Sequence, residues 1–225
     1  MKKLKVGIVG LSRGNGFVSV FNAHPRVEIA ALCDLDEERL NRTGEAFKLT
    51  GKQLFTGYDD FINTDIEIVV VATPIAFHAE QSIKAMENDK HVLCEQTAAY
   101  TVADCEKIVD TVRRTGKVYM MAENYCYFHY VREWKKIIGQ GKLGNIYYAE
   151  AEYVHEIVDL LIAEKTGKKF WRYTRPAIWY CAHCIGPLLH LMDDRIVKAS
   201  GSHAGFNTYP DRKDAIGFLD MEVGL

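Results

Sequence analysis

The sequence lacks an apolar run long enough to cross a membrane. Its longest apolar runs, such as the one from Ile66 to Thr73, are far shorter than the ~20 residues that a membrane-spanning helix needs. An excess of one charge is also absent, because 28 Lys and Arg stand against 30 Asp and Glu, a formal net charge of -2. This balance gives no electrostatic reason to expect a nucleic-acid partner or an anionic membrane.

The chain also lacks internal repeats, low-complexity segments and a linker rich in Pro, Gly or Ser. No apolar region of the signal-peptide type stands between Met1 and the first expected strand, so a cytoplasmic location is expected. Of the 225 residues, 48% are apolar and 26% are charged, which is typical of a soluble globular protein with one large or two modest domains.

A second Cys-x-x-Cys motif is missing, and this weakens any prediction of a structural metal site. Most of the six cysteines stand in apolar contexts, a usage that fits a reducing compartment. The segment Cys181-Ala182-His183-Cys184 has metal-ligand spacing, and Cys126, His129 and His190 could supply further ligands. A single such motif is a weak signal without its structural context, so no metal is predicted.

The first 122 residues alternate between strand-like and helix-like segments. Strands are expected at 3–9, 27–32, 66–72, 90–95 and 117–122, and helices at 17–22, 36–49, 58–62, 77–88 and 102–115. This alternation predicts right-handed crossovers and a parallel sheet. The segment 66–72, apolar at every position except Glu67, indicates a sheet that is covered on both faces. The predicted fold class is therefore α/β, with a doubly wound Rossmann domain over 1–122.

The pattern changes after Ala122, and a second domain of the α+β type is expected over 123–225. An amphipathic helix is expected at 130–138, a one-sided antiparallel strand at 145–155 and another strand at 217–223. A small sheet that ends on an unpaired edge strand is marginally stable. We therefore expect this second domain to be incomplete and the chain to be a fragment of a longer one.

A glycine-rich loop follows the first strand and opens a helix. In Gly10-Leu11-Ser12-Arg13-Gly14, small residues would let backbone N–H groups approach a pyrophosphate, although the motif is degenerate and an ordinary turn is the alternative. Asp34 ends the second strand, where a carboxylate would bind the ribose 2′-hydroxyl and favour NAD over NADP. The alternative is that Asp34 caps the next helix.

Polar residues also follow the two strands at 66–72 and 90–95. In an open parallel sheet, ligands bind outside the carboxyl ends of the strands, so Thr73, Glu95 and Gln96 stand where a cofactor and a substrate would meet. His78 follows Pro74 by one helical turn and could reach the cofactor. A single helical histidine is, however, more often a surface or core residue.

The segment 179–190 carries a phenol and an imidazole three residues apart. Tyr180 and His183 would share one face of a helix, an arrangement suited to moving a hydroxyl proton near neutral pH. The alternative is the packing face of that helix. Tyr153, His155, Trp171 and Arg172 offer aromatic and polar groups for sugar binding, although aromatic residues are also ordinary core material.

Together these features resemble the Gfo/Idh/MocA family of NAD(P)-dependent oxidoreductases, which act mostly on sugars and cyclitols. The segments that carry the resemblance are 7–11, Asp34, 72–74 with His78, 90–95 and 141–146. It covers nearly the whole chain and implies an NAD cofactor and a second domain on an open, mostly antiparallel mixed sheet. The residues that it assigns to the cofactor are Gly10, Ser12, Arg13, Gly14, Asp34, Thr73, Pro74, His78, Glu95, Gln96 and Asn124.

The chain departs from this family at the expected catalytic lysine. The family usually has Glu-Lys-Pro where this chain has Glu95-Gln96-Thr97, and its usual Asp-x-x-x-His pair is also missing. Tyr180-x-x-His183 followed by Gly186-Pro187 is instead similar to the NAD-dependent α-N-acetylgalactosaminidases, a glycosidase branch that also lacks the lysine. The segment 120–125 is similar to the same branch.

Three functions follow from the resemblance. The first is NAD-dependent oxidation of a sugar or glycoside hydroxyl at C3, with His183, Tyr180 and Gln96 as catalytic residues. The second is hydrolysis through transient C3 oxidation, and the third is a non-catalytic NAD-binding scaffold. The expected substrate-binding residues are Tyr125, Tyr153, His155, Trp171 and Arg172. The resemblance also implies a homo-oligomer that assembles through the C-terminal sheet.

Overall fold

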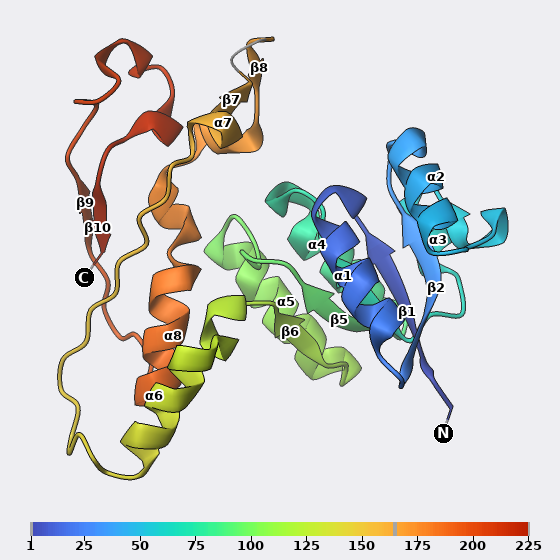
Figure 1. Cartoon of the computed structure of the whole chain (residues 1–225), viewed down its shortest axis with the longest axis horizontal. Helices are drawn as coiled ribbons and strands as arrows, with labels where there is room; N and C mark the ends of the chain where they lie inside the picture. Colours follow the sequence, from blue (N-terminus) through green and yellow to red (C-terminus); the bar gives the residue numbers. More distant parts are fainter. Residues whose placement is uncertain (1, 164–165, 225) are drawn as a thin grey trace. The chain divides into compact units, whose positions relative to one another are not determined.

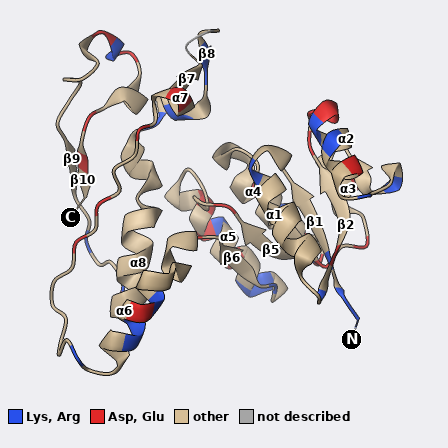
Figure 2. Ribbon diagram, in the orientation of Figure 1, with Lys and Arg blue, Asp and Glu red and all other residues tan. Residues whose placement is uncertain are grey.

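The chain divides into two compact units, Met1–Ala122 and Glu123–Leu225 (Figure 1). The structure is a computed structural model that describes residues 2–163 and 166–224. Among these residues, no helix combines the length and apolar character that crossing a membrane requires. Basic and acidic side chains stand close together on the exposed helices α2 (Glu37–Ala46) and α6 (His129–Gly139), as Figure 2 shows.

The first unit is built on one parallel sheet of six strands in the order β3-β2-β1-β4-β5-β6. The strands are β1 (Leu4–Val9), β2 (Val27–Cys33), β3 (Leu54–Phe55), β4 (Ile68–Val71), β5 (His91–Cys94) and β6 (Tyr119–Met121). The helical elements are α1 (Leu11–Ala23), α2, η1 (Gly51–Gln53), α3 (Tyr58–Ile62), η2 (Ile75–Phe77), α4 (His78–Glu87) and α5 (Val102–Thr115). The predicted doubly wound α/β fold is confirmed.

Strand β4 shows why this sheet needs a helical layer on each face. Val69 and Val71 pack into one core cluster and Val70 into the other, and all three side chains are fully buried. Because successive side chains of a strand point to opposite faces, a strand with apolar residues at every position is stable only when both faces are covered. The carboxyl end of β4 is thereby held at the centre of the sheet.

One local prediction for this unit was wrong, and one strand was missed. Helix α1 begins at Leu11 rather than Phe17, and strand β3 was not expected. Gly14 and Gly16 lower the intrinsic helix propensity of the segment, but Leu11 and Gly14 are buried. Burial of Leu11 and Gly14 against the sheet extends the helix back to the glycine loop, because tertiary packing supplies most of the stability of helices in proteins.

The second unit contains short elements. Its helical elements are η3 (Asn124–Tyr127), α6, α7 (Val158–Leu161), η4 (Trp171–Thr174), η5 (Ala177–Tyr180), α8 (Ala182–Met192), η6 (Pro210–Arg212) and η7 (Ile216–Phe218). Its strands are β7 (Ile162–Ala163), β8 (Lys168–Lys169), β9 (Gly201–His203) and β10 (Glu222–Gly224). They pair as β7 with β8 and β9 with β10, both antiparallel. A small core gathers around Leu161, Tyr173 and Phe218.

Two strand predictions for the second unit were wrong. Residues 145–155 form no strand, and 217–223 divides between η7 and β10. The segment 145–155 alternates in sequence, yet Tyr147, Tyr148 and Val154 are largely exposed. An alternating pattern specifies a strand only where one face has a core to pack on and an edge to pair with. Among the residues that the structure describes, Tyr153 packs on other aromatic rings, but no strand pairs with this segment.

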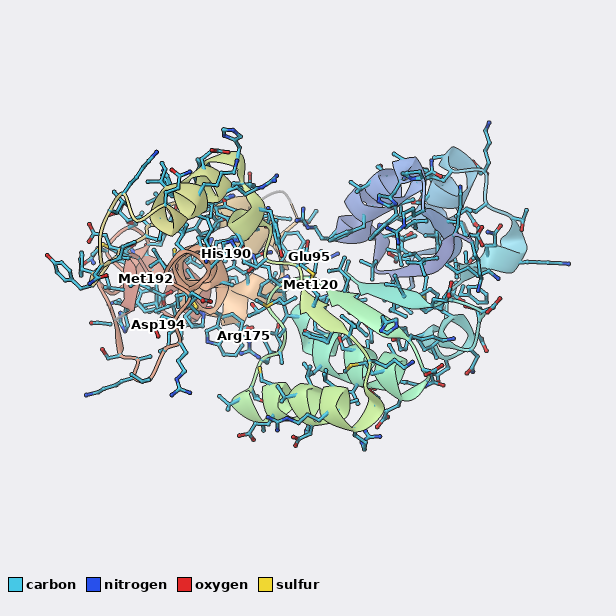
Figure 3. The ribbon with its side chains drawn as sticks, turned by 90° about the horizontal axis from the view of Figure 1, so that it is seen from below. Glu95, Met120, Arg175, His190, Met192 and Asp194 are labelled. Carbon is cyan, nitrogen blue, oxygen red and sulfur yellow. The ribbon has the colours of Figure 1, made fainter. Side chains whose placement is uncertain are left out.

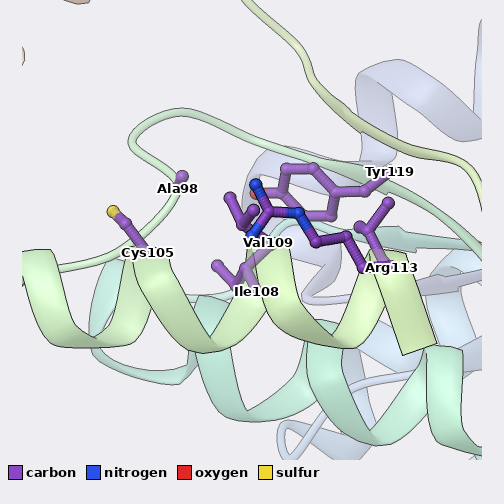
Figure 4. A pocket seen from close by; sticks show the side chains of 7 residues that line it. Ala98, Cys105, Ile108, Val109, Arg113 and Tyr119 are labelled. Carbon is purple, nitrogen blue, oxygen red and sulfur yellow. The ribbon is translucent and has the colours of Figure 1, made fainter. Parts of the chain in front are cut away.

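An apolar hollow of about 320 Å³ lies along α5, at the edge of the first unit (Figure 4). Its walls include Ala98, Cys105, Ile108 and the ring of Tyr119.

Cys105 is exposed, whereas Cys33 and Cys94 are buried in the sheet. This contrast gives the thiols of one unit very different reactivities.

We expect iodoacetamide to alkylate Cys105 at about pH 8 to 9 and to leave Cys33 and Cys94 unmodified, because Cys105 is exposed even though partial burial and the neighbouring Asp104 also raise the pKa of its thiol. Burial raises the pKa of the Cys33 and Cys94 thiols to about 12, so the reactive thiolate of each becomes abundant only as the pH approaches that value. Peptide mapping by mass spectrometry measures the modification. Denaturant is the control, since unfolding should expose all three thiols. Rapid labelling of Cys33 or Cys94 in the folded protein would contradict the prediction.

Candidate cofactor and catalytic sites

Polar groups gather at the carboxyl edge of the first unit's sheet. Because β1, β2, β4 and β5 are parallel, the residues that follow them lie along one edge. These are Gly10 after β1, Asp34 after β2, Thr73 shortly after β4, and Glu95 with Gln96 after β5. Asp34, Glu95 and Gln96 are buried polar side chains. A ligand that fits this edge must therefore bring hydrogen-bonding groups to it.

Gly10 makes the close turn from β1 into α1. Its φ is 85°, in the left-handed region, and a Cβ atom there would lie 2.6 Å from backbone atoms of Ala72 and Thr73. A Cβ atom on Gly14 would lie 3.0 Å from Ile8, so this glycine lets α1 pack closely on the sheet. These are the two geometric requirements of a dinucleotide-binding loop, which leaves backbone N–H groups and the helix N-terminus available for a pyrophosphate.

Asp34 is held by hydrogen bonds on both of its oxygens. Its Oδ2 accepts from the Leu11 N–H at 2.6 Å, and its Oδ1 accepts from the Asp36 N–H at 2.9 Å. The Arg39 guanidinium donates to the same carboxylate at 3.0 Å. The N-cap of α2 is Asp36, whose side chain accepts from the Arg39 N–H. Asp34 is thus tied to the glycine loop and does not cap α2.

His78 lies at the start of α4 and is only 1% exposed. Its Nδ1 lies 2.7 Å from the carbonyl oxygen of Thr97, and its Nε2 lies 2.7 Å from that of Thr73. A neutral imidazole can donate to only one of these carbonyls. The ring joins the segment after β4 to the segment after β5, so its contacts with the protein are those of a positioning residue.

An ion pair connects the glycine-rich loop to the end of β5. Arg13 Nε donates to Glu95 Oε1 at 2.5 Å, and Glu95 Oε2 accepts from the Gln96 N–H at 2.9 Å. The Glu95 side chain is 8% exposed, and it lies at the carboxyl end of β5 (Figure 3). Thr73 donates its hydroxyl proton to Gln81. The sequence positions of Arg13 and Glu95 are 82 residues apart, so only the fold brings them together.

The second unit contains a buried carboxylate–imidazole pair. Glu123 Oε1 lies 2.8 Å from His183 Nδ1, and the two side chains are 7% and 8% exposed. The same oxygen accepts from the Tyr125 N–H at 3.0 Å. The other oxygen, Oε2 of Glu123, is buried and has no hydrogen-bond partner among the residues that the structure describes. A carboxylate at Nδ1 favours the tautomer with its proton there, which makes Nε2 the basic nitrogen.

Three tyrosine rings surround His183. Tyr125 stacks on the imidazole with 4.0 Å between ring centroids, and Tyr153 and Tyr180 meet it edge-on at 5.0 and 5.2 Å. Tyr180 ends η5 and His183 lies in α8, so the two residues come from consecutive elements rather than one helix face. Burial, and to a lesser degree the neighbouring Tyr125, raises the pKa of Tyr153 to about 12, which keeps this phenol protonated at neutral pH.

The predicted sugar-binding residues border the same rings. The Arg172 guanidinium lies over Trp171 at 4.2 Å and over Tyr180 at 4.9 Å. His155 is exposed and lies 5.7 Å from the Tyr153 ring. Asn124, predicted as a cofactor residue, is exposed at the start of η3. The structure thus brings Tyr125, Tyr153, Tyr180, Arg172 and His183 into one cluster, which we call the aromatic cluster.

Glu123 was missed as a site residue. The signal was present, because Glu123 follows β6 closely, just as Glu95 follows β5. No group of three or more His, Cys, Asp or Glu suited to a metal occurs within 2–163 and 166–224. Burial raises the pKa of the Cys181 and Cys184 thiols.

Known proteins resemble the chain in both sequence and fold. It is 35% identical to a glycosyl hydrolase family 109 protein from Shewanella pealeana, over 95% of this chain and 51% of the relative. It is 33% identical to an α-N-acetylgalactosaminidase from Shewanella oneidensis, over 86% of this chain and 45% of the relative. The chain thus spans about half the length of these curated relatives.

Solved structures share the fold at low sequence identity. A scyllo-inositol dehydrogenase from Lactobacillus casei, determined with NAD(H) and scyllo-inositol, matches 100% of this chain and 66% of its own with a TM-score of 0.83 at 19% identity. A probable dehydrogenase from Thermotoga maritima gives a TM-score of 0.81 at 15% identity, over 98% of this chain and 64% of its own. Residues 4–123 match the sequence model of an oxidoreductase family with an NAD-binding Rossmann fold. The chain belongs to this family, Gfo/Idh/MocA, whose Rossmann domain binds NAD.

Proposed function

We propose that the protein oxidises the C3 hydroxyl of a sugar or glycoside. The observation that carries this proposal is the buried Glu123–His183 pair inside the aromatic cluster, in a chain whose other unit is an NAD-binding Rossmann domain. Aromatic rings with polar neighbours suit the apolar faces and hydroxyl groups of a sugar. The first unit would then bind the cofactor, and the second unit would bind the substrate.

The residues at the sheet edge fit the dinucleotide. The Gly10–Gly14 loop and the N-terminus of α1 would hold the pyrophosphate, Asp34 would accept from the adenosine ribose, and Glu95 would lie toward the nicotinamide. When bound, NAD supplies the hydride acceptor for the carbon that is oxidised. The protein's part is to position the substrate and to move its hydroxyl proton.

In our proposal, His183 accepts that hydroxyl proton at Nε2. Glu123 holds the proton on Nδ1 and stabilises the positive charge that develops on the ring, because the carboxylate lies 2.8 Å away in a buried site. The stacked Tyr125 ring limits rotation of the imidazole. Gln96 can orient a hydroxyl by hydrogen bonding, but its amide neither gains nor loses a proton near neutral pH.

A second candidate function is redox-neutral hydrolysis, which begins with the same step. A ketone at C3 acidifies the proton at C2, the aglycone leaves from C1 by elimination, water adds, and the C3 ketone is reduced again. Gln96 in place of the usual lysine and the relatives called glycosyl hydrolases favour this candidate. His183 or Tyr180 would remove the C2 proton.

The two candidates differ in what accumulates. The protein is incubated with NAD and a panel of nitrophenyl glycosides and free sugars, and NADH and nitrophenol are both followed. Net NADH supports simple oxidation, whereas nitrophenol release without net NADH supports hydrolysis. Solvent deuterium at C2 of the product would also mark hydrolysis. If NAD binds and no sugar reacts, both candidates are wrong and the protein is a nucleotide-binding scaffold.

We also propose that the protein is cytoplasmic and forms a homo-oligomer through its second unit. All six cysteines are free thiols, as expected for a reducing compartment. Large apolar side chains such as Tyr147 and Val154 are more than 90% exposed in the second unit, which is the property expected of a surface that associates.

Replacing Glu123 with glutamine should lower kcat by at least about ten-fold. The amide can still face Nδ1, but it cannot stabilise a charged imidazole, so we expect KM and NAD affinity to change little. Steady-state kinetics and a separate NADH titration measure this split. Glu152→Gln, at an exposed carboxylate of the same unit, is the matched control. Equal kcat for Glu123→Gln and the wild type would exclude Glu123 from the reaction.

A further inference from the structure

Helix η5 is a single short turn whose first N–H groups need partners from elsewhere in the fold. Its N-cap is Pro176, whose side chain has no hydrogen-bond acceptor. The N–H groups in the first turn of a helix have no partner within that helix. The Ile178 N–H instead donates to Oε2 of Glu222, 44 positions further along the chain. A carboxylate of β10 therefore caps η5 from outside.

The side chain of Ile178 contacts the same pair of strands. Gly201 of β9 and Gly224 of β10 are cross-strand partners. A Cβ atom on Gly201 would lie 3.6 Å from Ile178 Cδ1, and one on Gly224 would lie 3.5 Å from it. The Ile178 side chain therefore packs over the backbone of this glycine pair. The β9–β10 sheet holds Ile178 both by its N–H and by its side chain.

Two residues after Ile178, η5 ends at Tyr180, whose ring belongs to the aromatic cluster. This ring meets His183 edge-on at 5.2 Å, and the Arg172 guanidinium lies 4.9 Å from its centre. A short 3-10 turn has few internal hydrogen bonds of its own, and helices in proteins owe most of their stability to tertiary packing. The place of the Tyr180 phenol beside His183 therefore depends on the contacts that hold η5.

We propose that Glu222 is a positioning residue that holds η5 so that the Tyr180 phenol lies beside His183. It acts through Ile178 and takes no proton in the reaction. This inference rests on the proposed function, in which Tyr180 and His183 handle the substrate's protons, and extends it to the β9–β10 sheet. Burial raises the pKa of the Glu222 carboxyl, whereas the Ile178 N–H and His203 lower it, so the group is partly shielded from water.

Two substitutions at Glu222 separate the hydrogen bond from the charge. Glu222→Gln keeps an oxygen that can accept from the Ile178 N–H, whereas Glu222→Ala leaves that N–H without its partner. With the most reactive sugar or glycoside of the panel, Glu222→Ala should lower kcat at least about ten-fold, because small misplacements of reacting groups are costly. Glu222→Gln should keep kcat within about three-fold, and NADH affinity should stay within about two-fold in both variants. Glu152→Ala, at an exposed carboxylate of the same unit, is the control and should match the wild type.

A double-mutant cycle with Tyr180→Phe shows whether Glu222 acts through the phenol. Once the hydroxyl is absent, displacement of the ring has less effect, so Glu222→Ala should lower kcat less than about two-fold in the Tyr180→Phe background. An equal loss in both backgrounds would overturn the inference, and so would full activity of Glu222→Ala. Thermal unfolding shows whether each variant is folded. Glu222→Asp shortens the side chain by one methylene group and gives a milder break of the same hydrogen bond if Glu222→Ala does not fold.

Hydrogen exchange tests the same contact without any turnover. Peptides that cover 177–181 are followed by mass spectrometry after the folded protein is transferred to deuterated water. Exchange of this segment should become at least about ten-fold faster in Glu222→Ala and stay unchanged in Glu222→Gln. Unchanged exchange in Glu222→Ala would contradict the inference. If the wild type neither oxidises nor hydrolyses any compound of the panel, the proposed function fails, whereas the exchange rates still decide whether Glu222 holds η5.

Discussion

Replacing His183 with asparagine is expected to lower turnover by about two to four orders of magnitude. Asparagine has an N–H donor near the position of Nδ1, so it can still pair with Glu123, but it has no basic nitrogen in place of Nε2. Glu123 is 7% exposed, and an unpaired buried carboxylate would destabilise the protein. The asparagine variant therefore removes proton transfer while it keeps a partner for Glu123. His183→Ala would remove both, so its loss of activity could come from unfolding.

Three measurements define this result. Turnover of the best substrate should fall, NADH affinity should stay within about two-fold because unit 1 is untouched, and the unfolding temperature should change little. His190→Ala is the matched control, since His190 is an exposed histidine on the same helix α8 (Figure 3). Full activity in His183→Asn, or an equal loss in His190→Ala, would exclude His183 as the proton acceptor.

The parts of the fold that were predictable carry their signals locally. Helix α5 has the predicted bounds because Thr101 accepts from the Asp104 N–H at its start and Gly116 adopts a φ of 68° at its end. These are short-range cap interactions that the sequence displays directly. The strand β4 was also predictable, because a run of valines indicates a strand that is buried on both faces.

Long-range pairing was not predictable in the same way. The segment 145–155 has the alternation of a strand, yet it pairs with no other strand among the described residues, and sequence periodicity does not specify a pairing partner. Conversely, β3 has only two residues and owes its strand conformation to its pairing with β2. In both cases the outcome depends on residues far away in the chain rather than on the segment itself.

In the candidate site, too, some features are visible in the local sequence and others depend on long-range contacts. The rule that ligands lie beyond the carboxyl ends of parallel strands selected Glu95 from sequence alone, and the spacing after the glycine-rich loop selected Asp34. The partners of these carboxylates, Arg39 and Arg13, are evident only from the fold, as is the pairing of Glu123 with His183 across 60 residues. Sequence reasoning located the chemical groups, whereas the three-dimensional contacts show which of them pair with one another.

Replacing Gly10 with alanine is expected to damage both folding and cofactor binding. The added Cβ would lie 2.6 Å from backbone atoms of Ala72 and Thr73, and the φ of 85° disfavours any residue with a side chain. Left-handed strain and overpacking together predict a loss of about 2 to 5 kcal/mol in the free energy of unfolding. Relief of the clash must displace the loop that carries the N-terminus of α1, so NADH affinity should fall at least about ten-fold.

Gly16→Ala is the matched control on the same helix. A Cβ atom at Gly16 meets no other heavy atom within 4 Å, and alanine is the better helix former. This variant should raise the free energy of unfolding by about 0.5 to 1 kcal/mol and leave NADH affinity unchanged. Denaturant unfolding and NADH titration of both variants give the comparison. If Gly10→Ala were as stable as Gly16→Ala and bound NADH equally well, the close approach of Gly10 to β4 would have no part in cofactor binding. A loss confined to Gly10 would instead show that the first turn of α1 is built around the dinucleotide.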